Sequence, residues 1–115
     1  MLGVATMAAG GRDAEAAEQM RRGLERFPRS SLELTLNFGV ALSRVGTAEA
    51  DAESLAAFRR AADLWGSSPE AAFNLGDALA RTGAATEAGL SFSRARVLAA
   101  AVGNAELADL AARRL

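Results

Sequence analysis

Two stripes of polar side chains are the groups in this sequence best placed to bind a partner. Each stripe begins with a glutamate, continues with an asparagine four residues later and ends with an arginine. They comprise Glu33, Asn37, Val40 and Arg44, and Glu70, Asn74, Asp77 and Arg81, with Leu36 and Phe73 beside them. Steps of three and four residues place side chains on one face of a helix. Because asparagine both donates and accepts hydrogen bonds, and arginine binds carboxylates in a forked geometry, the stripes suit contact with a peptide.

The residue types that the chain lacks disfavour catalysis. It contains no histidine, cysteine, lysine or tyrosine, so the commonest general base and the usual nitrogen nucleophiles are missing. Neither a disulfide nor a thiolate metal site is possible. The serines before Pro69 stand where a helix N-terminus attracts anions, but the lysine and glycine spacing of a phosphate loop is absent, and helix capping explains them. We expect no catalytic residue, metal or cofactor.

The charge pattern also narrows the class of partner. The thirteen basic residues are all arginines, fourteen residues are acidic, and the formal net charge is −1. This balance disfavours nucleic acid as a partner, although RNA binding through paired arginines remains an alternative with steep salt dependence. No apolar run approaches the roughly 20 residues of a spanning helix, and Met1 to Ala9 lacks a basic leader. We expect a cytoplasmic protein without membrane insertion.

The stretch from Pro69 to Ala101 predicts two antiparallel helices that are broken at Gly83. Its residues Asn74-Leu75-Gly76, Leu79, Gly83, Ala88, Phe92 and Ala95 match the spacing of a known helix-turn-helix repeat. The sequence therefore resembles the tetratricopeptide repeat (TPR) family. That resemblance implies an all-α fold, a right-handed α-solenoid of about three TPR helix-turn-helix units plus a C-terminal capping helix.

An earlier stretch repeats the pattern. Apolar residues recur at helical spacing from Leu32 to Val45, where Gly46 ends the run, and again from Ala48 to Trp65. In this second run Phe58 and Ala61 correspond to Phe92 and Ala95, and Ser54 stands where the later copy has Ala88. The middle unit has three extra residues, since nineteen positions separate Gly39 from Phe58 and sixteen separate Gly76 from Phe92. We place them at the turn or in the first turn of the second helix.

Local signals predict where the helices begin and end. The run Ser30-Ser31-Leu32-Glu33 predicts a capping box, with Glu33 reaching back to the helix start, while Ser68 is expected to be an N-cap with Pro69 at the first helical position. Near the N-terminus we expect a short helix over Met1 to Ala9, a reversal at Gly10-Gly11, and a helix from Asp13 to Phe27 that Pro28 stops. Gly103-Asn104 should precede a capping helix from Ala105 to Leu115. The expected repeats are residues 1–30, 31–68 and 69–102 of one domain over 1–115, with the cap at 103–115.

Two glycines in the middle of helices support a tight packing arrangement. Gly39 and Gly76 each cost about 0.8 to 1.0 kcal/mol in helix propensity relative to alanine. In the TPR pattern the missing side chain lets the paired helix approach closely, with Phe58 or Phe92 filling the space beside it. We therefore expect both glycines at close helix crossings.

The resemblance also implies a function. Leading helices line the concave surface of TPR proteins, so the two stripes would face a groove that binds a peptide or a helical segment of another protein. No chaperone tail is expected, because the carboxylate-clamp subtype needs lysine. Three alternatives stay open: the asparagines are structural and the stripes ordinary solvated surface, the chain is a structural block that forms a homodimer through its terminal helices, or it is a fragment of a longer TPR scaffold.

Overall fold

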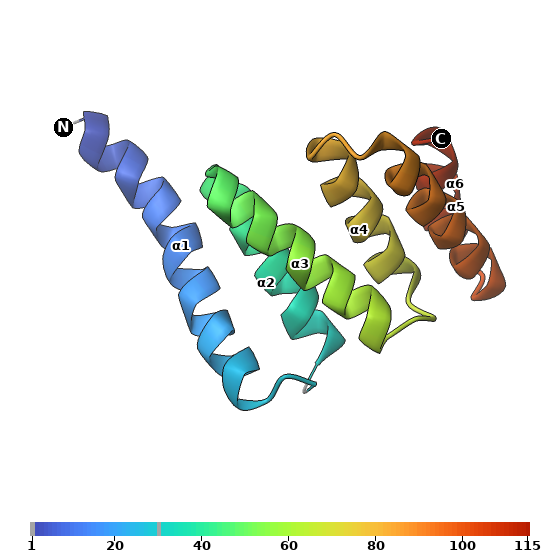
Figure 1. The fold of residues 1–115 in the computed structure, drawn as a ribbon, viewed down its shortest axis with the longest axis horizontal. Helices are drawn as coiled ribbons and strands as arrows, with labels where there is room; N and C mark the ends of the chain where they lie inside the picture. The colour runs from blue at the N-terminus through green and yellow to red at the C-terminus, as the bar shows by residue number, and fades with distance from the viewer. Residues whose placement is uncertain (1, 30) are drawn as a thin grey trace. The chain divides into compact units, whose positions relative to one another are not determined.

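The computed structural model describes residues 2–29 and 31–115, with side chains described from residue 11 onward. This part of the chain is all-helical and contains no strand, as expected from the sequence (Figure 1). The helices are α1 (Leu2–Arg26), α2 (Leu32–Val45), α3 (Ala48–Leu64), α4 (Pro69–Arg81), α5 (Ala85–Ala101) and α6 (Ala105–Arg113). The chain divides into two compact units, Met1–Ala57 and Phe58–Leu115.

Glycines in the left-handed conformation end three of the helices where the sequence predicted breaks. Gly46, Gly83 and Gly103 have φ angles of 85°, 88° and 76°. An L-amino acid with a side chain rarely adopts such angles, so glycine is the residue that allows the sharp reversal after α2 and after α4. The turns of both hairpins therefore follow directly from the sequence.

Side-chain caps begin the next helices. The hydroxyl oxygen of Ser31 accepts a hydrogen bond from the backbone N–H of Leu34 at 3.1 Å, and that of Ser68 accepts one from Ala71 at 3.1 Å. The prediction of Ser68 as N-cap, with proline at the first helical position, is confirmed. The predicted capping box is wrong in its second half. Because Ser31 is the N-cap, the third helical residue is Leu34, and Glu33 lies one position too early to reach back.

The predicted break in the N-terminal helix is also wrong. Helix α1 runs without interruption through Gly10 and Gly11 to Arg26, so the expected short first helix, the reversal and a first hairpin do not occur. Met1 lies outside the described residues. Each glycine disfavours the helix by about 1 kcal/mol relative to alanine, but its N–H and C=O groups still form the helical hydrogen bonds. Flanking residues of high helix propensity therefore allow the helix to continue through both glycines. The helix ends one residue before the predicted Phe27, whose side chain is 62% exposed.

The first compact unit packs α1 and α2 with the N-terminal part of α3. Its core consists of Ala17, Phe38, Ala41, Leu42, Ala50 and Ala57, with Met20, Leu24 and Val45 packed against it. Across the α2–α3 hairpin, the buried Ser54 hydroxyl donates to the Gly39 carbonyl at 2.7 Å. Helix α3 begins ten residues before Phe58, whereas α5 begins seven before Phe92. The three extra residues therefore lie in the first turn of α3, one of the two predicted places.

The second compact unit contains the end of α3 and the α4–α5 hairpin, with α6 packed mainly against α5 (Figure 1). Ala72, Ala95 and Ala111 form its central cluster, with Phe73 and Leu98 packed against them. A Cβ atom added at Gly76 would lie 2.9 Å from a ring carbon of Phe92, closer than real contacts allow. The predicted close crossing at Gly76 is confirmed, and it positions the buried Phe92 ring directly against α4.

Candidate functional site

The ten residues predicted to contact a partner all remain accessible. Glu33, Asn37, Arg44, Glu70 and Arg81 are exposed, whereas Leu36, Val40, Phe73, Asn74 and Asp77 are half-buried. Buried positions of α2 include Phe38 and Leu42, and those of α4 include Ala72 and Leu79. The fully buried positions of α2 and α4 are thus distinct from those of the two polar stripes. The binding role of these stripes stays a prediction.

The α4 stripe contains a residue that contacts the last helix. Asp77 accepts a hydrogen bond at 2.6 Å from a terminal nitrogen of Arg114, which follows α6. The second oxygen of Asp77 lies 4.0 Å from the Nε atom of Arg81, one helical turn along α4. The carboxylate is therefore engaged by two guanidinium groups, one from its own helix and one from 37 residues away.

Two aromatic rings also lie close to the guanidinium group of Arg114. Its guanidinium carbon lies 4.8 Å from the ring centroid of Phe92 and 5.9 Å from that of Phe73. The two rings pack edge to face, with centroids 5.3 Å apart and planes at 64°. A guanidinium within about 6 Å of an aromatic face is attracted by the ring quadrupole. We name the set Phe73, Asp77 and Phe92 the arginine corner.

No local pattern around Arg114 predicts this corner. Asn104 caps α6 as Ser68 caps α4, so the start of the helix follows from the sequence, whereas the contact between Arg114 and Asp77 joins residues 37 positions apart. A hollow of about 330 Å³ lies beside the corner, lined by Ala80, Ala85, Ala88, Gly89, Phe92, Arg114 and Leu115.

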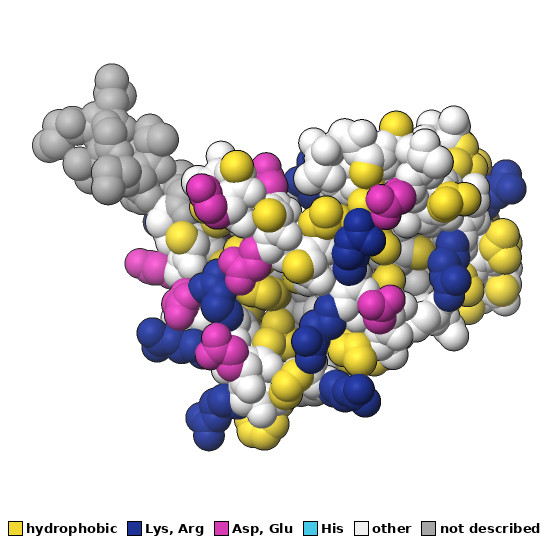
Figure 2. Space-filling view, viewed as in Figure 1, with side chains coloured by type: hydrophobic (Ala, Val, Ile, Leu, Met, Phe, Trp, Pro, Cys, Tyr) yellow, Lys and Arg dark blue, Asp and Glu magenta, His cyan; other side chains and the backbone are white. Residues whose placement is uncertain are grey.

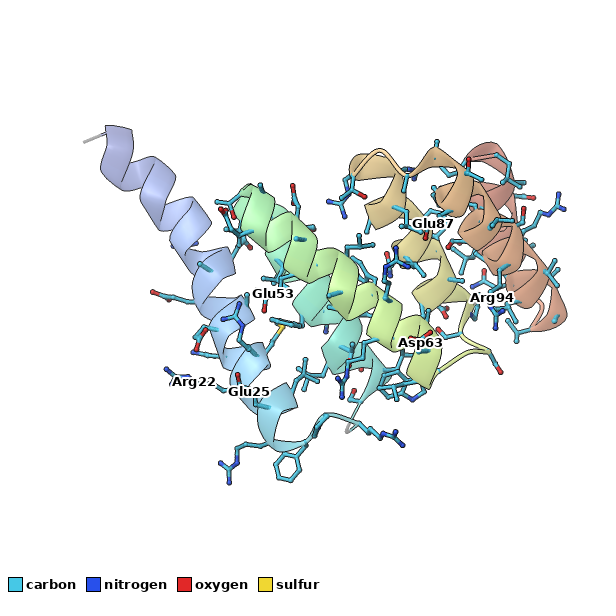
Figure 3. The ribbon with its side chains drawn as sticks, viewed as in Figure 1. Arg22, Glu25, Glu53, Asp63, Glu87 and Arg94 are labelled. Carbon is cyan, nitrogen blue, oxygen red and sulfur yellow. The ribbon has the colours of Figure 1, made fainter. Side chains whose placement is uncertain are left out.

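The first unit has a polar cluster of its own between α1 and α3. Arg21 donates to Glu53 at 2.7 and 2.8 Å and also pairs with Glu18. Figure 3 shows Glu53 on the side of α3 that faces α1. The hydrogen bond to Glu53 raises the pKa of the Arg21 guanidinium further above its usual value, so this group stays charged at every pH the fold encounters. The cluster borders a hollow of about 330 Å³ with Ala17, Leu42 and Ala50 in its lining.

Two arginines tie parts of the second unit together. Arg59 bonds Glu87 at 3.1 Å, and Arg94 donates to the backbone carbonyl of Gly66 at 2.8 Å. Glu87 and Arg94 both project from α5 (Figure 3). On the face shown in Figure 2, positive and negative side chains are interspersed rather than gathered by sign.

The described residues contain no group of three or more histidine, cysteine, aspartate or glutamate side chains placed to hold a metal ion. Within the same part of the chain, no helix combines the length and apolar character required to cross a bilayer. A scan of the chain against protein-family models gives no match, and a search of curated proteins gives none either. The function is therefore argued from the site itself.

Proposed function

We propose that this chain is a non-catalytic protein-interaction module. In this proposal the hairpins α2–α3 and α4–α5 are TPR-like units of a right-handed solenoid, and their leading helices bind a peptide or helical segment of another protein. The observation that carries the proposal is that each leading helix uses different positions for packing and for its polar stripe. In both, the buried residues hold the hairpin together and the matched polar stripe is left accessible.

The chemistry of the stripes suits a peptide partner. The side-chain amides of Asn37 and Asn74 offer one acceptor and two donors each, which is the complement of a peptide group. Arg44 is exposed at the end of the α2 stripe, where its planar guanidinium is suited to a carboxylate. The half-buried Leu36 supplies apolar contact area beside these polar groups.

Substitution of both asparagines tests the proposal. The Asn37→Ala, Asn74→Ala double variant should capture less of the partner from an extract of the native source, while its melting temperature stays within about 2 °C of the unmodified chain. Gln19→Ala is the matched control, because it removes an exposed side-chain amide from α1. Equal capture by the double variant and the control would contradict the proposal, and a large loss of stability would show that the asparagines are structural.

A structural, self-associating role is the second candidate. It is favoured by large apolar side chains that α5 and α6 leave exposed: Leu90 at 69%, Val97 at 62% and Leu110 at 46%. Size-exclusion chromatography with light scattering separates the two functions. A dimer that forms with rising protein concentration supports self-association, whereas a monomer throughout the range supports binding to a different protein.

A further inference from the structure

The arginine corner is complete without α6. Phe73 and Asp77 belong to α4, Phe92 belongs to α5, and these two helices pack extensively against each other. The absence of a side chain at Gly76 fixes the position of the Phe92 ring, and the edge contact with Phe73 holds it there. The residues of the corner therefore all belong to the α4–α5 hairpin, and Arg114 contacts them from the end of α6.

Helix α6 packs mainly against α5, but most of its side chains are exposed. It has nine residues, and Ala111 is its single fully buried side chain. Isolated helices this short are marginal in water and depend on packing. The side chains of the Arg114–Asp77 pair are 40% and 36% exposed, and ion pairs this accessible contribute little to stability. Segments with few buried contacts open more readily than the core around them.

The contacts of α6 define what could replace it. A small residue fits where Ala111 is fully buried, and an arginine three residues later reaches the corner. The next residue, Leu115, lines the hollow beside Phe92. The pattern is small-x-x-Arg-apolar at the C-terminal end of a helix. The carboxylate of Asp77 selects a cation, and the two rings favour a planar guanidinium over an ammonium group.

We propose that α6 is a displaceable internal ligand, and that the arginine corner binds a helix of a partner protein that carries the small-x-x-Arg-apolar pattern. This inference rests on the proposed interaction function and names the class of partner for the α4–α5 hairpin. The partner helix takes the place of α6, its arginine lying against Phe73 and Phe92 and bonding Asp77. In the free protein, Arg114 of the same chain makes these contacts.

The test uses the full chain and a labelled peptide with the sequence of residues 103–115. Ala111→Asp places a charge at a fully buried position and should release α6 without altering α4 or α5. Fluorescence anisotropy should show that this variant binds the peptide at least about tenfold more tightly than the unmodified chain, whose own α6 competes. An unrelated helical peptide carrying only the small-x-x-Arg-Leu pattern should bind as well.

Two peptide variants isolate the arginine contact. Arg114→Ala in the peptide should weaken binding about tenfold, the scale of a charge-assisted contact stacked on aromatic rings. Arg113→Ala removes the neighbouring exposed arginine and should change binding less than about twofold. Equal losses for the two peptides would overturn the proposal.

Hydrogen exchange provides a second measurement if Ala111→Asp fails to fold. In the unmodified chain, the amides of α6 should exchange at least about tenfold faster than those of α5, and Asp77→Asn should accelerate α6 further while leaving α5 unchanged. Exchange of α6 at the rate of α5 would show an integral helix and refute displacement. Because the probe peptide comes from this chain, these results are independent of whether the asparagine stripes bind a partner.

Discussion

Substituting Gly76 with alanine tests the packing on which the second unit depends. Gly76 lies in the interior of α4 and has a helical conformation, so backbone propensity alone favours the substitution. The added Cβ, however, would lie 2.9 to 3.1 Å from three carbons of the Phe92 ring. That ring is 2% exposed and packs against Phe73, so it has little freedom to move away.

The magnitudes of these two effects decide the expected result. A compatible glycine-to-alanine change stabilises by about 0.4–1 kcal/mol, whereas overpacking a close-packed site costs roughly 1–3 kcal/mol. Gly89 is the matched control because it lies in the interior of α5 and a Cβ there would have no atom within 4 Å. We expect Gly89→Ala to stabilise the second unit and Gly76→Ala to destabilise it. Gly76→Leu should destabilise it further.

Denaturation followed by tryptophan fluorescence measures the difference. Trp65 is the single tryptophan of the chain and belongs to the second unit, so its signal reports that unit. The two alanine variants should differ by about 1–3 kcal/mol in unfolding free energy, with midpoints separated by about 4 °C or more per kcal/mol. Equal stabilisation by both substitutions would refute the close-contact interpretation of Gly76.

Two further substitutions test local interactions. Ser68→Ala removes the hydroxyl that caps α4 and should lower the unfolding free energy by about 1 kcal/mol, whereas Ser67→Ala, one residue earlier, should leave the urea midpoint unchanged. Arg21→Gln removes two ion pairs in the first unit and should lower the unfolding free energy by no more than about 1 kcal/mol. This loss should shrink in 1 M salt, where the screening length is about 3 Å. Arg22→Gln is the control because it removes only an exposed ion pair with Glu18; a salt-independent loss for Arg21→Gln, or a cap effect at Ser67, would contradict these expectations.

Features set by one residue or by local periodicity could be read from the sequence. The helix ends at Gly46 and Gly83 follow from the left-handed conformation that glycine adopts freely, and the cap at Ser68 follows from its hydroxyl. The close contact at Gly76 was accessible as well, because a glycine inside a helix needs a packing reason. Each of these depends on interactions within about one hairpin.

Some features depend on a balance of opposing free energies or on contacts between residues that are distant in the sequence. These could not be predicted in the same way. The two adjacent glycines of α1 lower the helix propensity of this segment. The summed propensities of these glycines and of the flanking helix formers decide whether the helix continues. The arginine corner joins Asp77 to Arg114 across 37 residues, and its geometry follows from how α6 packs on the hairpin. Local patterns indicate which residues are polar, but not which of them form hydrogen bonds or ion pairs with one another.

Alanine dominates the buried core of the described chain, where twelve of the seventeen buried hydrophobic residues are alanines. A core of this kind exposes less apolar area on unfolding than one built from leucine and isoleucine. The heat-capacity increment of unfolding should therefore fall at or below the usual value of about 12–15 cal/mol/K per residue. Calorimetry should then give a broad, shallow dependence of stability on temperature, with cold denaturation displaced to lower temperatures than for a typical domain of this length.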